Sequence, residues 1–88
     1  MSKLNSLIFI ENIPTIDIHG HDRDSARVAV LDFINDNLKM GNHFIAIIHG
    51  IGQGILKEEI YKTLKNSNHV LEYRMWNYNR GCTVAYIE

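Results

Sequence analysis

The hydrophobic and polar positions near the start of the chain alternate with the period of a strand. In residues 15–18 this alternation places Ile16 and Ile18 on one face. Asp17 lies on the other face, and so does His19, which follows the segment. The pattern therefore predicts a short strand, and it predicts that Asp17 and His19 are neighbours.

Two longer segments repeat their apolar positions at helical spacing. The first helix is expected to begin after Asp22, a suitable N-cap, and to end before Gly41. Its apolar stripe consists of Ala26, Val30, Phe33, Ile34 and Leu38. The second is expected to follow residue 54 and to end at residues 66–68, with Leu56, Ile60 and Leu64 as its stripe. Both helices are therefore expected to be amphipathic.

The remaining hydrophobic segments predict further strands. Residues 44–48 are almost uniformly apolar, as expected for an inner strand covered on both faces. Residues 70–76 and 83–87 are expected to form a hairpin around a turn at residues 77–81. Residues 7–10 are a weaker candidate strand. The predicted order is β-α-β-α-β-β, with residues 1–14 as an N-terminal arm or extra edge strand and residues 15–88 as the domain.

Composition narrows the class of protein. The chain has 88 residues, 45% of them hydrophobic and 22% charged, which predicts one ordinary globular domain. Its single cysteine allows no internal disulfide and fits a reducing compartment, so we expect a cytoplasmic protein without a membrane span. The formal net charge of −1 excludes a global basic field, so any binding of nucleic acid has to be local.

A glycine-rich stretch joins the apolar strand to the second helix: His49-Gly50-Ile51-Gly52-Gln53-Gly54. Such a loop can turn its N–H groups and the positive end of the helix dipole toward an anion, and phosphate is the obvious candidate. The alternative is that a tight turn simply needs glycine. A second junction of the same kind, in which the strand at residues 15–18 runs into His19-Gly20, favours the functional interpretation.

The two histidines suggest a chemistry. If the first two strands are parallel neighbours, His19 and His49 both emerge at the carboxyl ends of the strands. Two imidazoles can act as general base and general acid in RNA transesterification without a required metal. Asp17 would orient His19 or hold one ion. The alternative for His49 is a bond to a backbone group that caps the loop.

Three motifs together resemble the small MutS-related (Smr) domain family. Residues 16–20, Ile-Asp-Ile-His-Gly, match its first motif, and residues 49–54 match its His-Gly-x-Gly-x-Gly motif. Residues 81–84, Gly-Cys-Thr-Val, resemble its closing segment. The resemblance covers residues 15–87. Two features depart from the family's pattern: Ile51 stands where a basic residue is common, and residues 77–80 replace a glycine-rich approach to the last strand.

The resemblance implies a fold like the C-terminal domain of bacterial translation initiation factor three. That fold is a two-layer α/β (α+β) sandwich with a four-stranded mixed sheet in the order 1-2-4-3, strand 4 antiparallel, and two helices on one face. It further implies a nucleic-acid binder, often an endonuclease for RNA or DNA, with Mg²⁺ or Mn²⁺ stimulation in some members.

The predicted function is a nucleic-acid-binding endonuclease that prefers RNA. Its catalytic residues would be Asp17, His19 and His49. Phosphate would be held by Gly50, Gly52, Gly54, Lys57 and Arg80. A binding module without catalysis and a ribosome-associated adaptor remain as alternatives. The bare sheet face is expected to be closed by residues 7–10 or by a second copy in a homodimer.

Overall fold

The computed structural model describes residues 2–7 and 12–88, and its elements follow the predicted order. They are η1 (Leu4–Ser6), β1 (Thr15–Asp17), α1 (Arg23–Lys39), β2 (Phe44–Ile48), α2 (Ile55–Asn66), β3 (Val70–Trp76) and β4 (Asn79–Ile87). The candidate strand over residues 7–10 lies largely outside the described residues. Leu7, its first residue, follows the short 3₁₀ helix η1.

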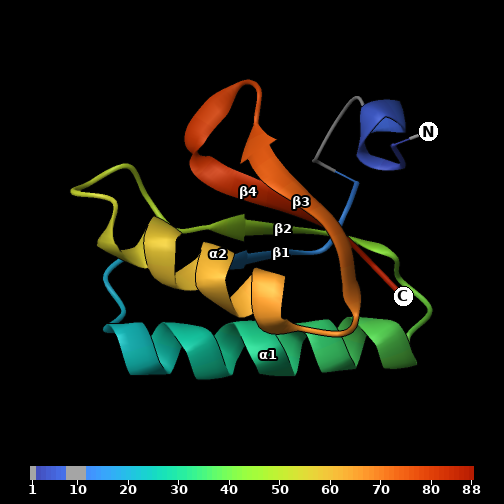
Figure 1. The fold of residues 1–88 in the computed structure, drawn as a ribbon, viewed down its shortest axis with the longest axis horizontal. Helices are drawn as coiled ribbons and strands as arrows, with labels where there is room; N and C mark the ends of the chain where they lie inside the picture. The colour runs from blue at the N-terminus through green and yellow to red at the C-terminus, as the bar shows by residue number, and fades with distance from the viewer. Residues whose placement is uncertain (1, 8–11) are drawn as a thin grey trace.

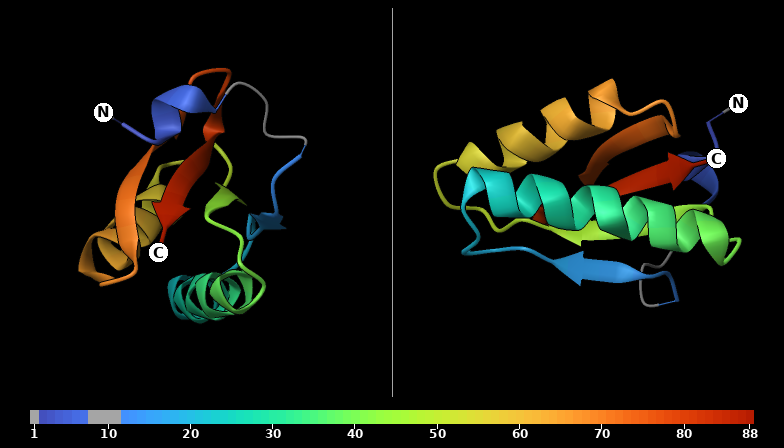
Figure 2. Two further views of the ribbon diagram at one scale, coloured as in Figure 1. Left: turned by 90° about the vertical axis from the view of Figure 1, so that its right-hand side faces the viewer. Right: turned by 90° about the horizontal axis from the view of Figure 1, so that it is seen from below.

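The four strands form one mixed sheet in the order β1-β2-β4-β3. β1 runs parallel to β2, whereas β4 is antiparallel to both β2 and β3. Helices α1 and α2 lie side by side on one face of this sheet, and η1 lies on the opposite face (Figures 1 and 2). The predicted two-layer fold and strand order are confirmed.

The predicted boundaries of α1 are confirmed by its caps. The Asp22 carboxylate accepts a hydrogen bond from the Ser25 N–H at 2.8 Å, and Gly41 takes a φ of 79° just beyond the helix. The apolar stripe did not predict Asn37, which is buried in the last turn. Its side-chain oxygen accepts from the Asn42 amide at 2.9 Å, so the polar group ties the helix to the following loop.

The main hydrophobic core lies between the sheet and the two helices. Its fully buried members come from both layers: Ile18, Ala26, Val30, Ile34, Ile45, Ile47, Ile60, Leu64, Ala85 and Ile87. β2 contributes from the centre of the sheet, which explains why its sequence is apolar at almost every position.

A second, smaller core covers the other face of the sheet, and Leu4 of η1 is its anchor at 1% exposure. Leu4 packs with Ala46, Trp76, Cys82 and Val84, and Leu7 and Ile13 border this cluster. The Glu72 carboxylate accepts the backbone N–H of Lys3 at 2.6 Å, and the Arg74 guanidinium donates to the Leu4 carbonyl at 3.2 Å. The described part of the N-terminal segment therefore closes this face.

The β3–β4 hairpin is tighter than predicted. Trp76 pairs with Asn79, so the turn comprises only residues 77–78 rather than 77–81. Arg80 and Gly81 consequently belong to β4. The Asn79 side-chain oxygen accepts the Gly81 N–H at 2.8 Å, a local bond that supports this extension of the strand.

Candidate nucleic-acid site

The two histidines meet at the carboxyl edge of β1 and β2. The N–H of Ile18 donates to the Ile48 carbonyl at 2.8 Å, so the two strands end level with one another. His19 and His49 both line a pocket of about 390 Å³ at this edge. The rest of its lining is the glycine loop and the first turn of α2: Gly20, Gly50, Ile51, Gly52, Gln53, Gly54, Ile55, Leu56 and Lys57.

Asp17 and His19 form an exposed pair, as the strand alternation predicted. His19 Nδ1 lies 2.5 Å from Asp17 Oδ1, and the His19 backbone N–H donates to the same oxygen at 3.1 Å. These bonds lower the pKa of Asp17 below its usual value, so the carboxylate stays ionised and accepts from Nδ1–H. The other ring nitrogen, Nε2, is therefore the atom of His19 that is available to a ligand.

His49 has a very different environment, with only 4% of the residue exposed. Its Nδ1 lies 2.9 Å from the Gly50 carbonyl, and its Nε2 lies 2.8 Å from the Thr83 hydroxyl. Because a carbonyl can only accept, Nδ1 carries the proton and Nε2 accepts from Thr83. Burial lowers the pKa of His49, and the nearby positive charge of Lys57 lowers it further, so the ring is neutral at pH 7.

The glycine loop is attached to the hairpin through Gly81. The Gly81 carbonyl accepts the N–H of His49 at 2.9 Å and that of Gly50 at 3.1 Å. A side chain at Gly81 would bring a Cβ to 3.2 Å from the Gly50 carbonyl carbon, which is closer than ordinary van der Waals contact, so this close approach favours glycine. The Gly50 amide is thus committed to β4, which leaves the later part of the loop for the expected contact with phosphate.

The N-terminus of α2 opens into the pocket without a side-chain cap. Its N-cap is Gly54, with a φ of 82°, and a glycine has no side chain that could accept the first helical N–H groups. Lys57 lies in this first turn, with its ammonium 5.5 Å from the centre of the Tyr61 ring. The free N–H groups, the dipole and the cation together give this end of the pocket a positive character.

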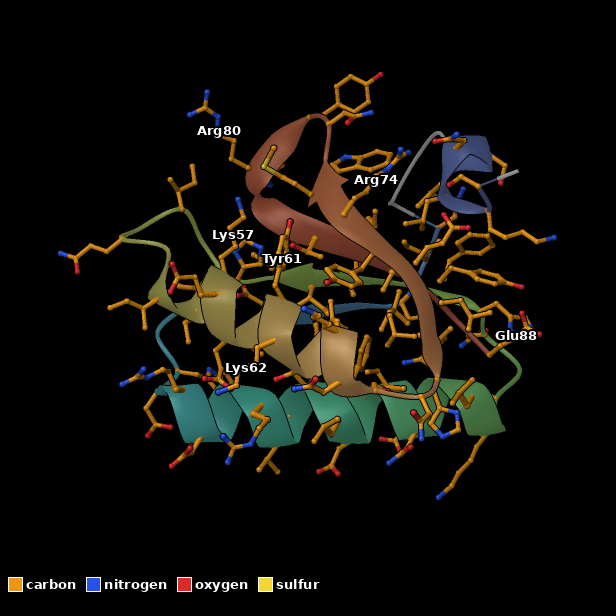
Figure 3. All side chains as sticks on the ribbon, viewed as in Figure 1. Lys57, Tyr61, Lys62, Arg74, Arg80 and Glu88 are labelled. Atoms are coloured by element: carbon orange, nitrogen blue, oxygen red, sulfur yellow. The ribbon has the colours of Figure 1, made fainter. Side chains whose placement is uncertain are left out.

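Arg80 does not line the pocket, although its neighbour Gly81 contacts the loop. Figure 3 shows the Arg80 side chain projecting outward from the hairpin, on the same side of the molecule as Lys57. Within residues 2–7 and 12–88, no three metal-ligating side chains converge on one point.

The pocket and the sheet define a two-layer α+β domain that carries a glycine loop at the carboxyl ends of its two parallel strands. Residues 16–87 match the family model described as the Smr domain, and the chain belongs to this family. The expected membership is therefore confirmed. None of the described helices is long and apolar enough to cross a membrane.

The chain is similar in sequence to parts of much larger proteins. It is 37% identical to endonuclease MutS2 of Caldanaerobacter subterraneus subsp. tengcongensis over 68 residues, which are 77% of this chain and 9% of that protein. It is 34% identical to endonuclease MutS2 of Clostridium novyi over 67 residues, 76% of this chain and 8% of that protein. The chain thus spans less than a tenth of the length of these relatives.

Two solved structures share the fold. The Smr domain of Thermus thermophilus MutS2 superposes with a TM-score of 0.84 at 20% identity, covering 86% of this chain and 99% of that one. YdaL, a stand-alone small MutS-related protein from Escherichia coli, superposes with a TM-score of 0.79 at 19% identity, covering 84% of this chain and 63% of that one.

Proposed function

We propose that this chain is a nucleic-acid-binding endonuclease that cleaves phosphodiester bonds and prefers RNA. The observation that carries the proposal is the meeting, in one pocket, of His19 with the uncapped N-terminus of α2. His19 offers a base for proton transfer, and the N-terminus of α2 offers a binding site for phosphate. The endonuclease names of the MutS2 relatives support the same activity.

The scissile phosphate would lie at the start of α2. The N–H groups of Gly52, Gly54 and the first helical turn would donate to its oxygens, and Lys57 would balance its charge. Lys57 in a first turn opposes the helix dipole when the pocket is empty, whereas a bound phosphate turns this cost into a favourable interaction. Arg80 would contact a phosphate outside the pocket.

His19 would act as the general base. Its Nε2 takes the proton of a ribose 2′-hydroxyl while Asp17 stabilises the imidazolium through Nδ1–H. The 2′-oxygen then forms a bond to phosphorus, and the bond from phosphorus to the 5′-oxygen breaks. The leaving oxygen takes a proton from solvent, and the products are a 2′,3′-cyclic phosphate and a 5′-hydroxyl.

His49 would support the site in a different way from the one that its motif suggests. Both of its nitrogens are engaged within the chain, so it would hold the Gly50 carbonyl and the loop in place. A direct role for His49 in proton transfer stays a prediction. It would require the ring to leave Thr83 when substrate binds.

The test compares cleavage of labelled single-stranded RNA by wild type and by the variants His19→Ala and Asp17→Asn. Loss of a general base lowers the rate by about 10²–10⁴-fold, so His19→Ala should be nearly inactive while retaining most of its RNA binding. His21→Ala, an exposed histidine two residues away, is the matched control and should cleave normally. Reactions with Mg²⁺, with Mn²⁺ and with EDTA measure metal stimulation. Cleavage by His19→Ala at the wild-type rate would overturn the proposed mechanism.

A binding module without catalysis is the second candidate, and the burial of His49 favours it. With both nitrogens of this ring bonded internally, the pocket contains one accessible imidazole instead of two. Ile51, an exposed residue of the pocket lining, also takes the place of a residue that is commonly basic in the family. RNA binding by a wild-type chain that cleaves neither RNA nor DNA would establish this candidate in place of the endonuclease. The ribosome-associated adaptor needs neither pocket residue, and an unaltered interaction in His19→Ala and Lys57→Ala would favour it.

A further inference from the structure

Tyr78 is the most exposed of the large hydrophobic residues that the structure describes, with 82% of its surface accessible. It lies in the two-residue turn of the β3–β4 hairpin. Its ring nevertheless has a defined position, because it packs against the buried Trp76 with ring centres 5.5 Å apart and an angle of 67° between the planes. An aromatic ring that is both held and accessible presents a platform to solvent.

The platform is connected directly to the pocket. Gly81, three residues after Tyr78, accepts the two N–H groups at the start of the glycine loop. Three residues of extended chain span about 10 Å, at about 3.3 Å each. Arg80 lies between the two, and in Figure 3 it projects from the hairpin on the same side as Lys57. The hairpin therefore carries an aromatic ring and a cation within three residues of the point where it is hydrogen-bonded to the start of the glycine loop.

We infer that the hairpin makes this site selective for single-stranded nucleic acid, with an unpaired base stacked on Tyr78. The inference rests on the proposed function, because the pocket must hold a phosphate of the same strand. Arg80 would contact the backbone between the pocket and the platform. In a duplex the bases are paired and stacked on each other, so none is free to cover the ring.

The chain contains a reporter for this contact. Trp76 is its only tryptophan, and it touches Tyr78, so a base that stacks on the tyrosine should change the tryptophan fluorescence. The probes are oligouridylate and oligodeoxythymidylate of about ten nucleotides, a strand of the same length and charge without bases, and a duplex of the same length. EDTA removes any metal-stimulated cleavage, and oligodeoxythymidylate lacks the 2′-hydroxyl that the proposed mechanism requires, so its titration measures binding alone. Comparison of the first two probes distinguishes RNA from DNA.

Wild type should bind the strand with bases more tightly than both the abasic strand and the duplex. Tyr78→Ala should weaken binding of that strand by about 5- to 140-fold, which is stacking of about 1–3 kcal/mol per base converted at 1.4 kcal/mol per tenfold. Binding of the abasic strand should not change. Tyr78→Phe keeps the ring and should bind as wild type does. Met40→Ala, an exposed apolar side chain beyond the far end of α1, is the control for nonspecific effects.

Equal affinity of wild type and Tyr78→Ala for the strand with bases would overturn the inference. The inference would also be overturned if Tyr78→Ala lost as much affinity for the abasic strand and the duplex as for the strand with bases, since this would indicate a general defect in binding. In both cases the proposed function would still stand if wild type cleaved RNA and His19→Ala did not. Wild type that binds none of the four probes would instead overturn the proposed function as well.

Discussion

The two histidines of the site show how environment separates residues that look alike in sequence. Each follows a strand and precedes a glycine, yet the side chain of His19 is 70% exposed and the whole of His49 is 4% exposed. His19 has a carboxylate as its partner, whereas His49 has a carbonyl and a hydroxyl. The first can gain a proton beside a negative charge, and the second would have to do so in a buried setting.

The buried histidine should make stability depend on pH. Because burial lowers its pKa in the folded chain below the ordinary 6.5, the unfolded chain binds the proton more readily. The free energy of unfolding should therefore decrease as pH falls from above about 6.5 toward the lowered pKa. Urea unfolding of wild type between pH 8 and pH 5 measures this decrease, and His49→Gln should show a smaller one. If the free energy of unfolding depended on pH identically in wild type and His49→Gln, the decrease could not be assigned to His49.

Thr83 provides an independent check at the same contact. Thr83→Val keeps the shape but leaves His49 Nε2 without its donor, which should lower the free energy of unfolding by about 1–3 kcal/mol at pH 8. Thr83→Ser keeps the hydroxyl and serves as the matched control. Equal stability of Thr83→Val and wild type would show that the hydrogen bond contributes little.

At the scale of elements, the contact between β4 and the glycine loop should determine how well the pocket forms. Gly81→Ala would place its Cβ 3.2 Å from one Gly50 atom and 3.3 Å from another, so the loop or the hairpin must shift. Overpacking of this kind typically costs about 1–3 kcal/mol, and we expect a loss in that range with weaker binding of phosphate-containing strands.

The control for this effect is Gly41→Ala, which strains a positive φ at the end of α1 but has open space around its Cβ. It should reduce stability without changing binding by the folded protein. Urea unfolding and a titration with oligouridylate measure the two quantities. Normal binding by folded Gly81→Ala would show that the pocket tolerates a displaced hairpin.

At the scale of the molecule, the N-terminal segment should dock and undock with pH. Glu72 accepts hydrogen bonds from Ser2 and from the backbone of Lys3 and Leu4, and these lower its pKa below the ordinary 4.5. Its contribution to stability is therefore fully present above about pH 4.5 and is lost as pH falls through the lowered pKa. Trp76 contacts the same cluster as Leu4, so its fluorescence should report an acid transition.

Two variants test this docking. Glu72→Gln should weaken the acid transition, because the amide does not change charge in this range. Leu4→Ala removes the buried anchor, and by the typical cost of such a cavity it should lower the free energy of unfolding by about 2–5 kcal/mol. An unchanged acid transition in Glu72→Gln would indicate that other carboxylates control it.

Local patterns in the sequence were enough to predict the order and type of the two α-helices and four strands, because each hydrophobic period is a property of neighbouring residues. The alternation at residues 15–18, the stripes of the two helices and the cap at Asp22 all depend on neighbours within a few residues. The pair of Asp17 and His19 was predictable for the same reason, since the two residues are only two positions apart at the end of β1. The glycine-rich motif at residues 49–54 correctly indicated where the pocket lies.

The contacts of the site residues, by contrast, are visible only in the folded chain. Thr83 is 34 positions away from His49, and nothing in the local pattern indicates that its hydroxyl meets the imidazole. The same holds for Gly81, whose carbonyl takes the Gly50 N–H that the motif alone would assign to phosphate, and for Leu4, which reaches the second face of the sheet. Such contacts depend on how distant strands and segments are brought together, which hydrophobic period does not encode.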